Sequence, residues 1–150
     1  MKADPTTNGA ARLYTPTLLA LAVELAACPR DPAQPLQGRA KSRTCGSEVL
    51  LSGALRADGA IEQIGMEVSA CAVGQASAAI FAAAAPGMDA RAITAKLEAM
   101  GDWLHGDAPH TILPRLELLD AARAYPARHE AILLPWRAAA AALSSQPNCG

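Results

Sequence analysis

Four cysteines are the side chains of this 150-residue chain best suited to chemistry, and two of them lie at expected junctions between structural elements. Cys45 precedes Gly46, which lets a backbone approach a ligand closely, and Cys71 lies where an expected strand turns into a helix. The unpaired N–H groups at a helix start favour an anion, and a thiolate is the species that a soft metal ion, an iron–sulfur cluster or a persulfide requires. The alternative is that both cysteines are small apolar residues in a core. The four cysteines are Cys28, Cys45, Cys71 and Cys149.

The composition excludes several classes of function. A chain of this length suits one domain, which buries roughly 70% of the surface that the unfolded chain exposes. The formal net charge of −1 gives no electrostatic footprint for nucleic acid, and two Trp, two Tyr and one Phe leave little for stacking on bases. No segment reaches the roughly 18 uncharged apolar residues of a membrane span. We therefore expect a globular protein that binds neither nucleic acid nor a membrane.

The first apolar stretch bears on the cellular compartment. The run Leu25-Ala26-Ala27-Cys28 looks like a bacterial lipoprotein cleavage box, but Glu24 within the stretch and Pro16 at its start favour a capped helix of a soluble protein. Without a signal peptide the chain stays in a reducing compartment, where cysteines are thiols, ligands or nucleophiles before they are disulfides. We therefore expect a cytoplasmic protein.

The N-terminal part predicts an arm followed by a helix. Residues 1–11 are polar and are expected to form a flexible arm. Thr15 suits an N-cap and Pro16 the first position of a helix. This helix is expected to run to about Cys28 and to stop at Pro29.

A three-stranded antiparallel meander is expected next. Its strands cover residues 38–44, 48–55 and 61–68. The turn Asp58-Gly59 joins the last two strands, because Gly tolerates the positive φ that such a turn requires. In the first strand Arg39, Lys41 and Arg43 alternate onto one face and lead toward Cys45. This basic row is either a solvated strand edge protected by charge or a docking face for an acidic partner.

The remainder of the chain is predicted to be helical. Helices are expected over residues 72–85, 114–124 and 131–143, and another is expected after its cap Asp89, with Ile93, Leu97, Met100 and Leu104 on one stripe. Pro135 is expected in the first turn of the last helix, where a missing N–H costs little. The fold class is therefore α+β, with an N-terminal helix, a three-stranded antiparallel sheet and then helices packed on one face of it. One domain over residues 12–143 is expected between the arm and a flexible tail, residues 144–150.

Three segments resemble a known family. Arg43-Thr44-Cys45-Gly46-Ser47 resembles the first-ligand loop of the NifU-like iron–sulfur cluster scaffolds, especially the SufU type. Ser69-Ala70-Cys71-Ala72-Val73-Gly74-Gln75-Ala76-Ser77-Ala78 closely resembles the second-ligand segment of that family. Residues 125–138, with Tyr125-Pro126-Ala127-Arg128 and Leu134-Pro135-Trp136-Arg137-Ala138, resemble its C-terminal segment. The resemblance covers roughly residues 12–143 and implies a SufE/NifU-like fold.

The resemblance implies a cytosolic scaffold or sulfur acceptor in iron–sulfur cluster assembly. Such proteins take sulfur from a cysteine desulfurase and serve apo iron–sulfur acceptor proteins. They assemble a transient cluster on three Cys and an Asp or, in the SufU type, hold zinc there while a Cys accepts persulfide. Cys45 and Cys71 are the reactive and ligating residues that this chain would contribute.

Two ligand positions of the family are changed in this chain. Ser47 stands where an Asp is expected, and Ala131 stands where the third Cys is expected. Two thiolates alone make a poor zinc or cluster site, because structural zinc requires four tetrahedral ligands. Four sources of further ligands remain open, namely His129, Glu130, Cys149 and a second subunit. The cofactor is accordingly a transient iron–sulfur cluster, zinc or none.

Three functions remain open from the sequence. The first is a scaffold-like protein that accepts sulfur, iron or both for cluster biogenesis, rather than an enzyme. The second is a non-catalytic interaction module that kept the fold and lost metal and cluster binding. The third is a metal-free persulfide relay, because sulfur exchange needs one accessible thiolate and no metal ion.

Overall fold

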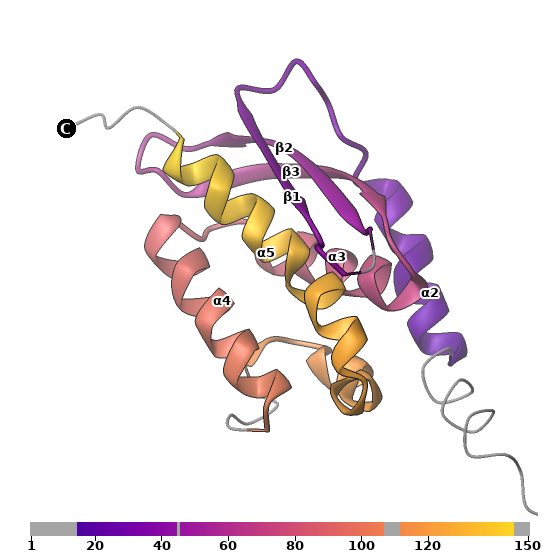
Figure 1. Ribbon diagram of the computed structural model, residues 1–150. Helices are drawn as coiled ribbons and strands as arrows, with labels where there is room; N and C mark the ends of the chain where they lie inside the picture. Colours follow the sequence, from indigo (N-terminus) through magenta and orange to yellow (C-terminus); the bar gives the residue numbers. More distant parts are fainter. Residues whose placement is uncertain (1–14, 45, 107–111, 146–150) are drawn as a thin grey trace, which may run out of the picture.

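The computed structural model describes residues 15–44, 46–106 and 112–145, and Figure 1 shows how its elements are arranged. Helices labelled α are α-helices and those labelled η are 3₁₀ helices. In chain order the elements are α2 (Pro16–Glu24), η1 (Leu25–Ala27), β1 (Leu36–Lys41), β2 (Glu48–Leu55), β3 (Ile61–Ser69), α3 (Ala72–Ala84), α4 (Ala90–Leu104), η3 (Leu116–Ala124), η4 (Pro126–Arg128) and α5 (His129–Ser144). The expected order of one helix, three strands and then helices is confirmed.

The three strands form an antiparallel meander in the order β1-β2-β3. In the register, Arg39 pairs with Leu50 and Leu51 pairs with Met66. The turn between β2 and β3 is the expected one, because Gly59 has a φ of 88° and the carboxylate of Asp58 accepts a hydrogen bond from the Ala60 N–H.

The helices cover one face of this sheet. Helix α5 packs along β1 and β2, α3 packs against β3 and α5, and the outer helices α2 and α4 pack on α3 and α5 respectively (Figure 1). Gly38 sets the contact between α5 and β1, because a Cβ there would collide with the carbonyl oxygen of Ala138 and would lie 2.7 Å from the Cβ of Ala142. The core between these layers is aliphatic, with Trp136 and Phe81 in edge-to-face contact at its centre.

Most helix boundaries follow the predicted capping residues. The Thr15 hydroxyl accepts a hydrogen bond from the Leu18 N–H at the start of α2, and the Asp89 carboxylate accepts one from the Ala92 N–H at the start of α4. Cys71 is the N-cap of α3, as expected. The first strand is shorter than predicted, since β1 ends at Lys41 and the following residues bend away toward α5.

Two C-terminal elements differ from the prediction. The expected helix over residues 114–124 is instead a 3₁₀ helix over Leu116–Ala124, and its buried residues Leu116, Leu119 and Ala122 recur every third position, which matches the period of that helix. Helix α5 begins at His129 rather than at residue 131, because η4 leads directly into it. Pro135 therefore lies in the second turn of α5 rather than the first.

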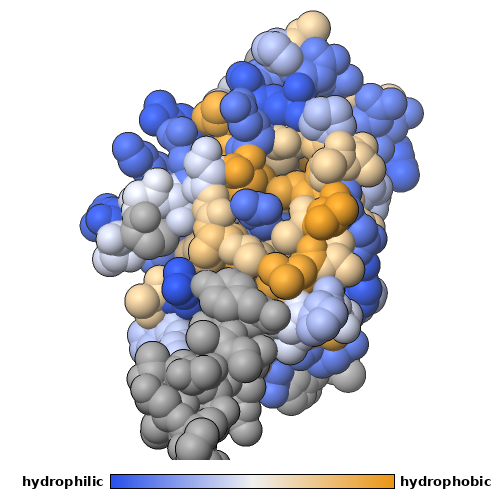
Figure 2. Space-filling model, turned by 90° about the vertical axis from the view of Figure 1, so that its right-hand side faces the viewer, coloured by the Kyte–Doolittle hydropathy of each residue, from blue (hydrophilic) through white to orange (hydrophobic). Residues whose placement is uncertain are grey.

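One side of the molecule exposes apolar side chains. Figure 2 shows a hydrophobic area on the side that carries α2, where Leu19 is 43% exposed and Val23 is 73% exposed. Within the described residues, no helix has both the length and the apolar composition that crossing a bilayer requires. The predicted arm over residues 1–11 and most of the predicted tail lie outside the described residues.

Candidate functional site

The first component of the site is Cys71, which the sequence placed at a strand-to-helix junction. Its backbone is extended, with φ −65° and ψ 169°, and its carbonyl oxygen accepts the Gln75 N–H that opens α3. Its side chain makes no capping hydrogen bond and is half-buried. The Gln75 amide instead donates to the carbonyl oxygen of Ala70 at 3.0 Å, which fixes the turn that precedes the helix. Cys71 thus forms no disulfide and lies half-buried at a helix N-terminus, against the edge of the hydrophobic core.

The second component is the first turn of α5, which packs against the first turn of α3. A Cβ at Gly74 would lie 3.3 Å from the Cβ of Ala131, so Gly74 allows the two helices to approach closely here. One turn further along α3, the buried Ser77 hydroxyl donates to the carbonyl oxygen of Ile132 at 2.6 Å. Ala131, where the family resemblance implies a third cysteine, therefore lies within one turn of Cys71 along α3.

The third component is the loop after β1, which leads into Cys45. One carboxylate oxygen of Glu130, Oε2, accepts the Ser42 hydroxyl at 2.7 Å, the Thr44 hydroxyl at 2.9 Å and the Arg43 N–H at 3.1 Å. The Ser42 N–H also donates to the carbonyl oxygen of Ser47 at 2.8 Å, which closes the loop on both sides of Cys45. The loop after β1 and the first turns of α3 thus each contact the first turn of α5.

These hydrogen bonds determine the charge state of Glu130. The hydrogen bond from the Ser42 hydroxyl, followed by the one from the Thr44 hydroxyl, lowers the pKa of the Glu130 carboxyl from an ordinary value of 4.5 to about 2. Backbone hydrogen bonds from Thr44 and Arg43 act in the same direction, and partial desolvation opposes them. Glu130 is consequently ionised at neutral pH, and its charge faces the loop.

His129 is turned away from this meeting point. Its Nε2 lies 2.9 Å from the carbonyl oxygen of Arg123, and its ring lies edge-on to the ring of His105 with centroids 6.0 Å apart. Residues two apart in an α-helix are separated by about 200° around the axis. His129 therefore points to the opposite side of α5 from Ala131.

The described side chains do not fit a four-ligand metal centre. Ala131 offers a methyl group that is 1% exposed, and Ser47 is a hydroxyl that is 6% exposed. The Glu130 oxygen nearest the loop already accepts four hydrogen bonds, and the Nε2 of His129 faces a backbone carbonyl. Among the residues that the structure describes, no group of three or more His, Cys, Asp or Glu side chains could hold a metal ion.

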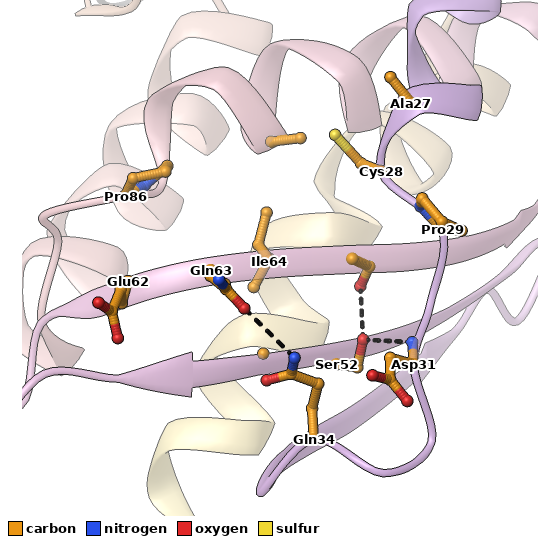
Figure 3. Close-up of a pocket in the computed structure, with 13 residues that line it drawn as sticks. Ala27, Cys28, Pro29, Asp31, Gln34, Ser52, Glu62, Gln63, Ile64 and Pro86 are labelled. Carbon is orange, nitrogen blue, oxygen red and sulfur yellow. Dashed lines mark hydrogen bonds between the residues drawn. The ribbon is translucent and has the colours of Figure 1, made fainter.

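The other cysteines lie apart from Cys71 or outside the described residues. Cys45 and Cys149 belong to the parts of the chain that the structure does not describe, so the proposed pairing of Cys45 with Cys71 stays a prediction. Cys28 is half-buried and lines a separate cavity of about 350 Å³ beside β3, together with Ile64 and the carboxylates of Asp31 and Glu62 (Figure 3). No residue of the Cys71 turn lines that cavity.

The predicted basic row is partly neutralised. Arg39 forms an ion pair with Glu48 on the neighbouring strand, while Lys41 and Arg43 are exposed. The positive charge that remains therefore lies at the Cys45 end of the row.

The sequence indicates Glu130 as a candidate metal ligand, but its contact with the loop was not predicted. A signal was present, because Ser42, Thr44 and Glu130 flank the expected positions of the first and third ligands. Only the fold brings residues 86–88 positions apart to hydrogen-bond distance.

Comparison with known proteins supports the resemblance at the level of structure. No family model and no curated protein matches the sequence. The solved structure of a NifU-like protein (N-terminal part) from Brucella abortus matches with a TM-score of 0.79 and 28% identity, over 91% of this chain and 95% of that one. A protein described as a scaffold for iron–sulfur cluster assembly in the SUF system of Fervidobacterium islandicum AW-1 matches with a TM-score of 0.75 and 19% identity, over 89% of this chain and 98% of that one. The resemblance carried by the Cys71 segment is thereby confirmed, and this chain has the fold of the NifU-like and SufU-type proteins.

Proposed function

We propose that this protein serves iron–sulfur cluster assembly as a scaffold-like sulfur acceptor, with Cys71 and Cys45 as its reactive thiols. A cysteine desulfurase would supply the sulfur, and apo iron–sulfur proteins would receive it or the cluster built from it. The fold neighbours support the general role. The chemistry rests on the residues of this chain.

The observation that carries the proposal is the placement of Cys71. Its thiol is partly exposed, makes no capping hydrogen bond and stands at the N-terminus of the 13-residue helix α3. The first turn of α3 leaves backbone N–H groups without helical partners beside this residue. Cys71 packs against the edge of the core and keeps part of its surface exposed, whereas Val73 and Ala76 in the same helix are fully buried.

The proposed step is a sulfur exchange that needs no external oxidant. The Cys71 thiolate attacks the terminal sulfur of the desulfurase persulfide and forms a new S–S bond. The S–S bond of the desulfurase breaks, and its cysteine leaves as a thiolate. One sulfur atom moves, and the number of electrons on each side is unchanged. Iron or a cluster would then be cargo rather than a resident cofactor.

Mass spectrometry after incubation with a cysteine desulfurase and cysteine tests the proposal. The wild-type chain should gain the mass of one sulfur atom on Cys71 or Cys45, and the double variant Cys45→Ser with Cys71→Ser should lose this gain. Cys28→Ser is the matched control, because Cys28 lies in a separate cavity and its loss should leave the gain unchanged. A chain that acquires no sulfur under these conditions contradicts the proposal. Repeating the reaction with a chelator separates a metal-free relay from a zinc-dependent acceptor.

A second candidate is an interaction module without sulfur chemistry. The observation in its favour is the buried methyl group of Ala131 and the hydroxyl of Ser47 at two positions where the family resemblance implies ligands. This candidate predicts that Cys71→Ser retains full function in cells. A loss of function in a variant that still folds excludes it.

A further inference from the structure

The contact between Glu130 and the loop after β1 joins two of the three segments that form the site. We call the Glu130 carboxylate and its donors Ser42, Arg43 and Thr44 the carboxylate clasp. The clasp lies between β1 and the first turn of α5, next to the position of Ala131. In the metal site that the family resemblance implies, ligands at positions 45 and 131 would connect these same two segments through the ion.

Several hydrogen bonds form the clasp, rather than a single surface contact. Its donors are two hydroxyls and two backbone N–H groups, and the Thr44 N–H is shared between Glu130 and the Ser42 hydroxyl at 3.3 Å and 3.2 Å. Hydrogen bonds to an ionised carboxylate are shorter and stronger than neutral ones. The second carboxylate oxygen lies 4.0 Å from the Arg137 guanidinium, about two turns further along α5.

A capping role within α5 does not account for the geometry. An acidic residue in the first turn of a helix is favoured by the helix dipole wherever its side chain points. The side chain of Glu130, however, takes its hydrogen bonds from residues 86–88 positions away and from none of the N–H groups of α5. The contact therefore orders the loop as well as the helix.

We propose that Glu130 is a positioning residue whose carboxylate holds the loop after β1 against α5 in place of a metal ion. This inference rests on the proposed function only in that the loop leads into Cys45, one of the two proposed sulfur-accepting thiols. It assigns to one carboxylate the ordering role that bound metal would have, and it predicts a site that is organised in the metal-free protein.

Amide hydrogen exchange on the chelator-treated protein tests the ordering directly. The N–H groups of Arg43 and Thr44 should be protected in the wild type without metal, and they should exchange about tenfold faster in Glu130→Gln, the change expected when a hydrogen bond to a charged group is lost. Glu98→Gln is the matched control, since Glu98 is exposed on α4 and away from the loop. Protection that is equal in all three proteins, or that appears only after zinc is added, overturns the proposal.

A milder variant covers the case in which Glu130→Gln does not fold. Thr44→Val removes one hydroxyl donor from the exposed side of the loop and leaves α5 unchanged. It should raise the exchange rate at Thr44 in the same direction by a smaller factor. No change in this variant counts against the clasp.

Thiol reactivity separates positioning from general stabilisation. In Glu130→Gln the alkylation rate of Cys45 by iodoacetamide should change severalfold, while the rate of Cys28 in its separate cavity stays at the wild-type value. A uniform change at both thiols indicates loss of stability alone and overturns the positioning role. If the chain accepts no sulfur but the exchange and alkylation results hold, the proposed function fails and the clasp stands. If sulfur is accepted and Glu130→Gln changes neither readout, the clasp alone fails.

Discussion

The Ser42 hydroxyl donates a hydrogen bond of 2.7 Å to the Glu130 carboxylate across 88 residues of sequence. This bond joins the end of β1 to the start of α5, two elements that otherwise meet further along, where Gly38 lies under Ala138. Hydrogen bonds therefore hold the first turn of α5 to two segments, the loop after β1 and helix α3.

Acid should weaken the folded state through Glu130. The pKa of this carboxyl is about 2 in the folded chain against an ordinary 4.5, so its contribution to stability is complete above pH 4.5 and is lost as the pH falls toward 2. Urea unfolding midpoints measured across this range should fall less steeply for Glu130→Gln than for the wild type. Glu98→Gln should keep the wild-type slope. Parallel curves for wild type and Glu130→Gln would show that the carboxylate has the same pKa in the folded and unfolded states.

Restoring the two missing ligands should create metal affinity. In the double variant Ser47→Asp with Ala131→Cys, an oxygen and a sulfur ligand are added at the positions that the resemblance implies. The double variant should bind one zinc per chain and gain about 2.7 kcal/mol of stability when free zinc is a hundredfold above its dissociation constant. Zinc analysis and thermal unfolding with and without chelator measure both effects. The pair Ser47→Ala with Ala131→Ser is the control, and zinc binding equal to that of the control contradicts the prediction.

Gly38 should tolerate no side chain. A methyl group there would collide with the Ala138 carbonyl oxygen, so Gly38→Ala should lower the free energy of unfolding by about 1–3 kcal/mol. Gly101 in α4 is the matched control, because a Cβ there meets nothing within 4 Å and its φ is not positive. Gly101→Ala should raise stability by about 0.5–1 kcal/mol. Equal effects of the two variants in urea unfolding would refute the close contact at Gly38.

The Ser77 hydroxyl should contribute more to stability than an exposed serine in a similar role. Ser77→Ala leaves the buried carbonyl oxygen of Ile132 without its side-chain donor and should cost about 1–3 kcal/mol. Ser144 also donates to a backbone carbonyl, that of Ala141, but it is exposed. Ser144→Ala should therefore change the unfolding free energy by less than about 0.5 kcal/mol. Calorimetry on the two variants provides the comparison.

Local rules were sufficient to predict most of the fold. The Thr15 and Asp89 caps, the Asp58-Gly59 turn and the alternating side chains of β3 depend on residues within a few positions of each other. The distinction between an α-helix and a 3₁₀ helix over residues 116–124 depends instead on which face is buried. That choice is made by the tertiary contacts.

The candidate site was predictable only in part. The sequence places Cys71 at a helix start because the strand and helix patterns on either side are local. The environments of Glu130 and His129 depend on which elements approach α5, and a helical pattern alone does not say which face meets the loop and which meets η3. Both side chains have the chemistry of metal ligands, and the fold gives both of them other partners.

Pro135 interrupts the backbone hydrogen bonds within α5. Without an N–H, residue 135 cannot satisfy the carbonyl oxygen of Ala131, so the opening segment of α5 is joined to the remainder by one backbone hydrogen bond fewer than usual. Residues on both sides of this proline are buried, with Ile132 and Leu134 ahead of it and Trp136 and Ala138 behind it. Because the opening segment of α5 has one backbone restraint fewer, it can adjust to a changed side chain at lower cost than an uninterrupted helix.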